Sequence, residues 1–137
     1  MSEVNRTLLV VDDDPGMRSQ LKWGFNDFEV MTADDRMHAL EIFNKYRPPI
    51  VTLDLGLPPD AEGSQEGFEI LRLILEIAPQ TYVLIVSGSA DIGNAEKAEE
   101  WGAYRYFAKP VDMAKLSAAV EQAYLAYISK KTKVEQL

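Results

Sequence analysis

Three carboxylates follow one another directly after a run of apolar residues near the start of the chain. Leu8–Val11 has the composition of a buried strand, and Asp12, Asp13 and Asp14 come next, before Pro15. At a separation of ~4 Å and an effective dielectric constant near ~20, each pair of like unit charges costs about 4 kcal/mol. A hard divalent cation such as Mg²⁺ relieves this repulsion and selects oxygen ligands, so the stretch predicts a metal site.

Three more side chains that could take part in a reaction stand at the ends of other apolar runs. Asp54 lies in TLDLGLP, Ser87 in VLIVSGSAD and Lys109 in YFAKPVD. In a parallel sheet the functional site lies outside the carboxyl ends of the strands, so these residues are expected to meet the acidic cluster at one edge. Asp54 is then available as a nucleophile toward phosphorus, which gives an acyl phosphate. Ser87 can donate a hydrogen bond to the phosphoryl oxygens, and Lys109 can pair with them.

Five strand and helix units are expected to position these residues. The hydrophobic pattern predicts strands at Leu8–Asp12, Glu29–Ala33, Ile50–Asp54, Tyr82–Ser87 and Tyr104–Phe107. It predicts helices that start at Pro15, span Arg36–Tyr46, Phe68–Ile77 and Asp91–Trp101, and run from Met113 onward, with Gly102 as the C-cap of the fourth. Nearly continuous apolar strands that alternate with helices indicate an α/β fold whose parallel sheet is covered on both faces.

Composition narrows the function classes. The chain has 137 residues, which indicates one domain, and it has no Cys, which excludes disulfides, thiolate metal sites and Cys nucleophiles. Its single His, His38, excludes catalysis by a His pair, and we assign it no role because we expect no partner at metal-ligand spacing.

Charge and hydropathy indicate where the protein acts. A net charge of −8 argues against direct nucleic-acid binding, which needs clustered Lys and Arg. The N-terminal MSEVNR carries no apolar leader, and no stretch approaches the length of a membrane span. We therefore expect a soluble, cytoplasmic protein.

The four motifs together resemble one family. LLVVDDDP, TLDLGLP, VLIVSGSAD and YFAKPVD, in this order, are similar to the receiver domain of two-component response regulators, over essentially residues 5–127. The resemblance implies a flavodoxin-like, CheY-like sheet of five parallel strands in the order 2-1-3-4-5, with five helices. It also implies that a sensor histidine kinase donates a phosphoryl group from a phosphohistidine to Asp54, with Mg²⁺ required.

The resemblance also assigns the metal ligands. Asp13 and Asp54 would bind the ion directly, the backbone carbonyl of Gly56 would complete the protein ligands, and Asp12 would act through water. The domain would accept and lose its own phosphoryl group and would not be an enzyme in the wider sense.

Signal output is expected on a neighbouring face. In receivers a switch pair, here Ser87 and Tyr106, carries the change from the phosphoryl group to the surface of the fourth helix, fifth strand and fifth helix. We expect a partner or a second subunit to bind there, near Ala95, Tyr104 and Tyr106, for transcriptional control.

Two features depart from the usual receiver pattern. Ser87 stands where Thr is commoner, which keeps the hydroxyl but loses a methyl group. The acidic loop from Pro58 to Gly67 is five residues longer than usual, and GLPPDAEGSQEG resembles receivers of NtrC-like, sigma-54-dependent activators of the PEP-CTERM type. The loop lies beside Asp54, so it can affect partner choice or dephosphorylation, and we expect Gly56 and Ser89 to tune the phosphoryl lifetime.

The C-terminal segment shows a heptad pattern. Apolar residues, with one charged break, recur in alternating steps of four and three at Leu116, Val120, Ala123, Tyr127, Lys130, Val134 and Leu137. Residues 1–127 are expected to form the receiver, with its last helix packed on the sheet. Residues 128–137 are either a frayed tail or a helical extension, which would link to an effector domain or pair two receivers.

The acidic residues also admit other interpretations. Asp14 before Pro15 is expected to cap a helix. A haloacid-dehalogenase-like Mg²⁺-dependent phosphatase could use Asp12 and Asp14 as its Asp-x-Asp, but no acidic pair follows Lys109 and Asp54 would have no role. A receiver-like docking module that is not phosphorylated predicts a degraded acidic site, whereas this one is intact. An FMN-binding flavodoxin needs a phosphate-binding loop where DDDPG would repel phosphate.

Overall fold

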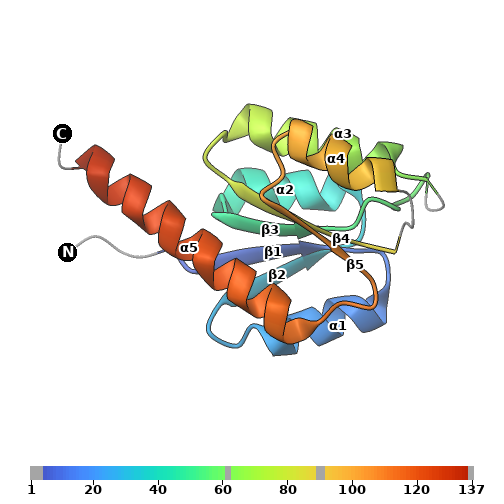
Figure 1. Ribbon diagram of the computed structural model, residues 1–137, viewed down its shortest axis with the longest axis horizontal. Coiled ribbons are helices and arrows are strands. Elements are labelled where there is room, and N and C mark those ends of the chain that lie inside the picture. Colours follow the sequence, from blue (N-terminus) through green and yellow to red (C-terminus); the bar gives the residue numbers. More distant parts are fainter. Residues whose placement is uncertain (1–4, 61–62, 89–91, 136–137) are drawn as a thin grey trace.

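The computed structural model describes residues 5–60, 63–88 and 92–135, with the backbone alone for 92 and 132–135. Strands and helices alternate along the chain (Figure 1). The strands are β1 (Thr7–Val11), β2 (Glu29–Ala33), β3 (Ile50–Leu53), β4 (Tyr82–Ser87) and β5 (Arg105–Ala108). The helices are α1 (Pro15–Gly24), α2 (Arg36–Tyr46), α3 (Gln65–Ile77), α4 (Ile92–Glu100) and α5 (Met113–Glu135).

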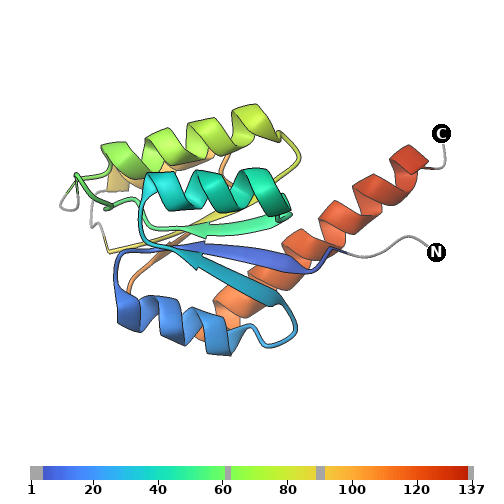
Figure 2. The ribbon, with the colours of Figure 1, turned by 180° about the vertical axis from the view of Figure 1, so that it is seen from behind.

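All five strands form one parallel sheet in the order β2-β1-β3-β4-β5. This confirms the predicted α/β class and strand order. Helices α1 and α5 cover one face, and α2, α3 and α4 cover the other, as Figures 1 and 2 show from opposite sides. The carboxyl ends of β1, β3, β4 and β5 therefore meet at one edge.

Burial on both faces explains why the central strands β1, β3 and β4 are apolar at nearly every position. In β1, Leu9 and Val11 join the core under α2, α3 and α4, whereas Leu8 and Val10 join the core under α1 and α5. All four side chains are buried. No described helix combines the length and the apolar character needed to cross a membrane.

Several element ends differ from the predictions. Strands β1 and β3 each end one residue earlier than expected, at Val11 and Leu53. The next backbone amides still bond to the neighbouring strand, Asp12 N to Ala33 O at 3.0 Å and Asp54 N to Val11 O at 2.9 Å. Each aspartate is therefore anchored by the sheet while its side chain lies beyond the last strand residue.

The third helix begins at Gln65 rather than at Phe68. Asp60 explains the earlier start, because its Oδ2 accepts a hydrogen bond of 3.2 Å from the Gln65 amide. Strand β5 is shifted by one residue, to Arg105–Ala108. The described part of α4 spans Ile92–Glu100, and Asp91, its expected first residue, lies outside the described residues.

Helix ends follow the predicted capping. Asp14 is the N-cap of α1, accepts a hydrogen bond of 2.9 Å from the Gly16 amide, and is followed by Pro15 in the first turn. Gly102 follows α4 with φ of +102°, a conformation that favours glycine.

Helix α5 continues well past Tyr127, the expected end of the receiver, to Glu135. Leu116, Val120 and Ala123 are buried against the sheet, and Leu125 is 58% exposed. The last turns of α5 extend beyond the sheet in Figure 1. Over the described residues, the segment from 128 to Glu135 continues α5 as a helix, and its expected role as a link or a pairing element stays a prediction.

Candidate functional site

Three charged side chains from different strand ends meet at the carboxyl edge of the sheet. The Lys109 Nζ lies 2.8 Å from Asp12 Oδ2 and 3.1 Å from Asp54 Oδ2. Asp12 and Asp54 are only 2% and 7% exposed. The convergence expected from the strand-end rule is therefore present, and one ammonium is shared between two buried carboxylates.

Backbone amides orient both carboxylates. Asp12 Oδ1 accepts a hydrogen bond of 2.9 Å from the Asp14 amide, and Asp54 Oδ1 accepts one of 3.1 Å from the Gly56 amide. Because one oxygen of each group is held by the turn that follows its strand, the other oxygen faces Lys109. The Arg18 Nη1 also donates to the Asp12 carbonyl at 2.8 Å, a contact that the sequence did not indicate.

Burial and neighbouring charges shift the titration of this group. Burial raises the pKa of Asp12 above its usual value, and the charge on Asp54 raises it further. The hydrogen bond from Lys109 lowers this pKa but does not cancel the effect of burial. Burial alone would lower the pKa of Lys109, but its bond to Asp12 and the charge of Asp54 raise it overall. The site therefore holds a firmly protonated ammonium beside a carboxylate that is costly to ionise.

The acidic residues have a donor set suited to a hard cation. Asp12, Asp13 and Asp54 each offer a carboxylate oxygen, and these oxygens lie within 4.8 Å of one another. Asp13 is the most exposed of the three. Oxygen-only ligands with one accessible side match the preference of Mg²⁺, which keeps several waters. The residues present therefore fit the ion that the sequence predicts.

Ser87 and Lys109 lie side by side across two strands. Ser87 ends β4, is 1% exposed and pairs in register with Ala108 of β5. Its carbonyl accepts a hydrogen bond of 2.9 Å from the Lys109 amide, and the Lys109–Pro110 peptide bond is cis. Ser89, expected to tune the site, lies outside the described residues.

Tyr106 connects this edge to a groove on the surface. It lies on β5, is partly buried and packs against the core under α2, α3 and α4. It also lines a groove of about 660 Å³ between α4, the segment that leads into β4, β5 and Lys130 of α5. Ala95 and Tyr104 line the same groove, so the structure brings together the three residues named for the partner face.

The expectation that His38 has no partner at metal-ligand spacing is wrong. The His38 Nδ1 lies 2.8 Å from Asp35 Oδ1 and 3.5 Å from Asp34 Oδ1. The hydrogen bond to Asp35 raises the pKa of His38. The cluster forms because Asp35 caps α2 and its carboxylate turns back toward the first turn. The spacing of three and four residues in the sequence was the available signal.

Comparisons with known proteins place the chain in a family. Residues 8–121 match the family described as the response regulator receiver domain. Sporulation initiation phosphotransferase F of Bacillus subtilis (strain 168) is 31% identical over 121 residues, which cover 87% of this chain and 94% of that protein. Regulatory protein AtoC of Escherichia coli (strain K12) is 29% identical over 133 residues, which cover 96% of this chain but 28% of AtoC.

A solved structure agrees with these matches. The crystal structure of the receiver domain of NtrX from Brucella abortus has a TM-score of 0.76 at 32% identity, and the match covers 85% of this chain and 97% of that one. AtoC and NtrX confirm the expected likeness to NtrC-like regulators. The narrower PEP-CTERM type stays a prediction. Since the family match spans most of the chain, and the sporulation phosphotransferase is matched over nearly its whole length, the chain belongs to the receiver domain family of two-component response regulators.

Proposed function

We propose that this domain is a phosphorylation-activated switch in which Asp54 accepts a phosphoryl group from a sensor histidine kinase. The observation that carries the proposal is the shared Lys109 ammonium, 2.8 Å from Asp12 Oδ2 and 3.1 Å from Asp54 Oδ2. A carboxylate oxygen of Asp54 attacks phosphorus, and an O–P bond forms as the N–P bond of the phosphohistidine breaks. The electron pair of that bond stays with the departing imidazole nitrogen.

Magnesium is the proposed cofactor. Asp13, Asp54 and the Gly56 carbonyl would hold the ion directly, and Asp12 would hold it through water. When bound, the ion supplies positive charge that offsets the negative charge on the transferring phosphoryl group. The cluster of three carboxylates supports this role, because their oxygens already lie within 4.8 Å of one another.

Lys109 and Ser87 respond to the new group. Phosphorylation replaces the single negative charge of Asp54 with a group that carries about −1.5 to −2 charges, which gives the Lys109 ammonium phosphoryl oxygens to pair with. The Ser87 hydroxyl donates to the same oxygens, and Tyr106 turns inward behind it. The direct backbone bond between Lys109 and Ser87 supports a coupled movement of the ends of β4 and β5.

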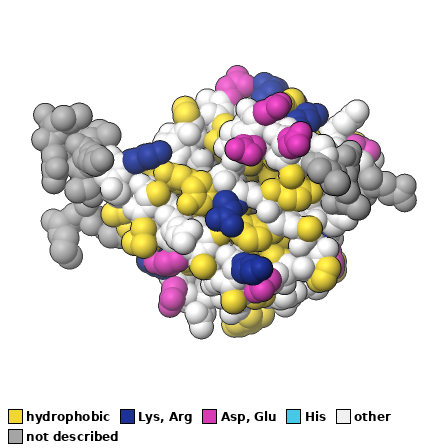
Figure 3. All heavy atoms as spheres, viewed as in Figure 1, with side chains coloured by type: hydrophobic (Ala, Val, Ile, Leu, Met, Phe, Trp, Pro, Cys, Tyr) yellow, Lys and Arg dark blue, Asp and Glu magenta, His cyan; other side chains and the backbone are white. Residues whose placement is uncertain are grey.

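The partner face is the α4–β5–α5 groove. It combines apolar lining with charges of both signs, from Glu96 and Glu99 on α4 and from Arg105 and Lys130 on β5 and α5. Figure 3 shows this side of the molecule, where apolar side chains gather with Lys and Arg among them. A second copy would bind here or along the extension of α5. Transcriptional control, in the cytoplasm and through a separate effector, is the proposed output.

The test is intact-protein mass after incubation with acetyl phosphate. A gain of one phosphoryl group that needs Mg²⁺ and disappears in Asp54→Asn supports the switch. No adduct and no Mg²⁺ binding would leave a docking module. Catalytic release of free phosphate that survives Asp54→Asn would favour a phosphatase. Against the phosphatase, the Asp14 carboxylate is already engaged as the N-cap of α1.

A further inference from the structure

We propose that Arg36, through its ion pair with Glu66, is a positioning residue that holds the Leu55–Gly56 backbone in place for magnesium binding. The inference rests on the function proposed above, in which the Gly56 carbonyl is a metal ligand. It extends that site to the first residue of α2, which belongs to none of the four motifs and touches none of the carboxylates of the site.

The first turn of α3 is pressed against the residue that follows Asp54. The Gly67 amide donates to the Leu55 carbonyl at 3.1 Å. A Cβ added at Gly67 would lie 2.3 Å from the Leu55 Cα, closer than real Cβ contacts come. Leu55 is itself fully buried. The start of α3 and the Leu55 backbone therefore move together, and Gly56 follows directly.

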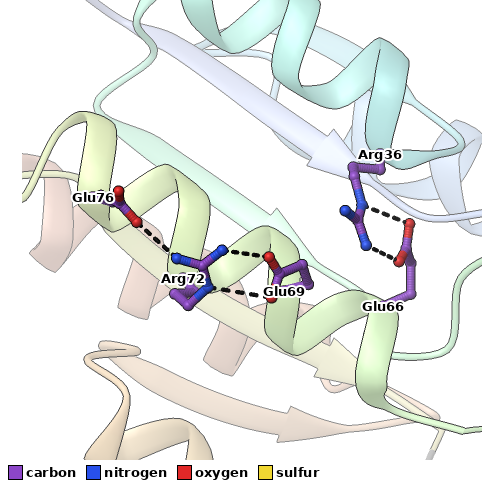
Figure 4. A network of polar contacts seen from close by, with 5 residues as sticks. All are labelled: Arg36, Glu66, Glu69, Arg72 and Glu76. Carbon is purple, nitrogen blue, oxygen red and sulfur yellow. Dashed lines mark hydrogen bonds and ion pairs between the residues drawn. The ribbon is translucent and has the colours of Figure 1, made fainter.

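Arg36 fixes this turn from the neighbouring helix. Its Nε donates to Glu66 Oε2 at 2.9 Å, and its Nη2 pairs with Oε1, so both carboxylate oxygens are engaged (Figure 4). The Glu66 side chain is 10% exposed. Because the guanidinium contacts both carboxylate oxygens, the pair fixes the orientation of the Glu66 carboxylate as well as its distance from Arg36. A nearly buried carboxylate is also costly to leave unpaired. Glu66 precedes Gly67 in the chain, so the pair restrains the contact with Leu55.

Aromatic packing holds the other flank of the same turn. The Phe68 ring contacts the Trp101 ring at a centroid distance of 5.3 Å, and the Lys97 ammonium lies 4.3 Å from the Phe68 centroid. The start of α3 is thus held from α2 by an ion pair and from α4 by ring contacts. Arg36 is the restraint that can be removed without opening the apolar core, because its own side chain is 41% exposed.

A second arginine in the same region provides a matched control. Arg72 pairs with Glu69 and Glu76, all within α3 and all on the surface (Figure 4). Arg72→Met removes the same charge as Arg36→Met without breaking a contact between helices. Either loss of a cation makes the protein more acidic, which by itself strengthens the binding of Mg²⁺. If Arg36 positions the backbone, Arg36→Met should instead weaken the binding of Mg²⁺, and Arg72→Met should not.

The experiment titrates MgCl₂ into the wild type, Arg36→Met, Arg36→Lys and Arg72→Met by calorimetry. Hydrogen exchange of the Gly67 amide is measured without metal. We expect Arg36→Met to weaken Mg²⁺ binding about threefold to tenfold, at or below the lower limit for partners that contact a metal ligand directly, because Arg36 acts through Glu66. Exchange at Gly67 should accelerate. Arg36→Lys keeps the charge but loses the second contact with Glu66, so its affinity for Mg²⁺ should lie between those of the wild type and Arg36→Met. Arg72→Met should bind Mg²⁺ as the wild type does or slightly more tightly.

Whether Arg36→Met binds Mg²⁺ more weakly than the wild type decides whether Arg36 has a positioning role. Mg²⁺ binding by Arg36→Met that equals or exceeds that of the wild type overturns the positioning role, as does equal weakening in Arg72→Met. Should Arg36→Met fail to fold, Arg36→Lys decides on the same criteria. A wild type that binds no Mg²⁺ overturns the proposed function and this inference together, whereas unchanged binding in the Arg36 variants overturns the inference alone.

Discussion

Replacing Asp12 by Asn should stabilise the protein when no divalent cation is present. Asp12, Asp13 and Asp54 have carboxylate oxygens within 4.8 Å of one another, and at that distance a pair of charges at an effective dielectric constant near ~20 repels by about 3 kcal/mol. The bond from Lys109 to Asp12 offsets part of this cost. Because the raised pKa of Asp12 means that its charged form is disfavoured overall, we expect a net gain in the free energy of unfolding that is smaller than this repulsion.

The stabilisation by Asp12→Asn should depend on pH. A carboxyl whose pKa is raised on folding contributes stability below its unfolded pKa of 3.8 and loses that contribution as pH rises through the folded pKa. The advantage of Asp12→Asn should therefore be absent in acid and appear as pH rises toward neutrality. Mg²⁺ should reduce the stability advantage of Asp12→Asn, since the ion stabilises the wild type more than it stabilises the variant.

Urea unfolding with EDTA or with MgCl₂ measures the effect, with Asp14→Asn as the matched control. Asp14 is exposed and Asn is an equally good N-cap, so its substitution should change the free energy of unfolding by less than about 0.5 kcal/mol. Asp12→Asn that is less stable than the wild type at neutral pH with EDTA would refute the reasoning. The ion pair with Lys109 would then outweigh the repulsion.

Three further outcomes are expected. Lys109→Met should lower the free energy of unfolding by about 3 kcal/mol in urea titrations with EDTA, because it leaves two buried carboxylates without their shared cation; no loss would contradict that pairing. An NMR titration should give His38 a pKa above 6.5 that falls in Asp35→Asn, so stability from this pair is present at acidic pH and is lost as pH rises through the His38 pKa. Gly67→Ala should destabilise the fold by more than about 2 kcal/mol in thermal or urea unfolding, because its Cβ would overlap the Leu55 backbone; a stable Gly67→Ala would show that α3 can move away.

The sequence was informative where topology alone brings residues together. Asp12, Asp54 and Lys109 lie far apart in the chain, but each follows a parallel strand, and parallel strands bring their carboxyl ends to one edge. Apolar runs also located the strands to within a residue, because both faces of the sheet are buried. No side-chain detail was needed for either inference.

Contacts between helices were not predictable in the same way. Arg36 and Glu66 are 30 residues apart and meet because α2 packs beside α3, which depends on helix orientation and rotamers. The earlier start of α3 was missed because Asp60 bonds the Gln65 amide from within a polar loop. The pairing of His38 was missed although Asp34 and Asp35 stand only four and three residues before it, directly before the first turn of α2.

The buried charge of the site makes it costly, and the same charge supports the switch that we propose. Two carboxylates, each less than a tenth exposed, share one ammonium, so the region keeps an excess of buried negative charge. On the proposed mechanism, a cation lowers that excess and a phosphoryl group raises it, so both act on the position of Lys109. The Lys109 amide is bonded to the Ser87 carbonyl, and Tyr106 lies three residues before Lys109, so on the same proposal a shift of Lys109 would reach the groove through the backbone. A site with balanced charge would bind the cation less strongly.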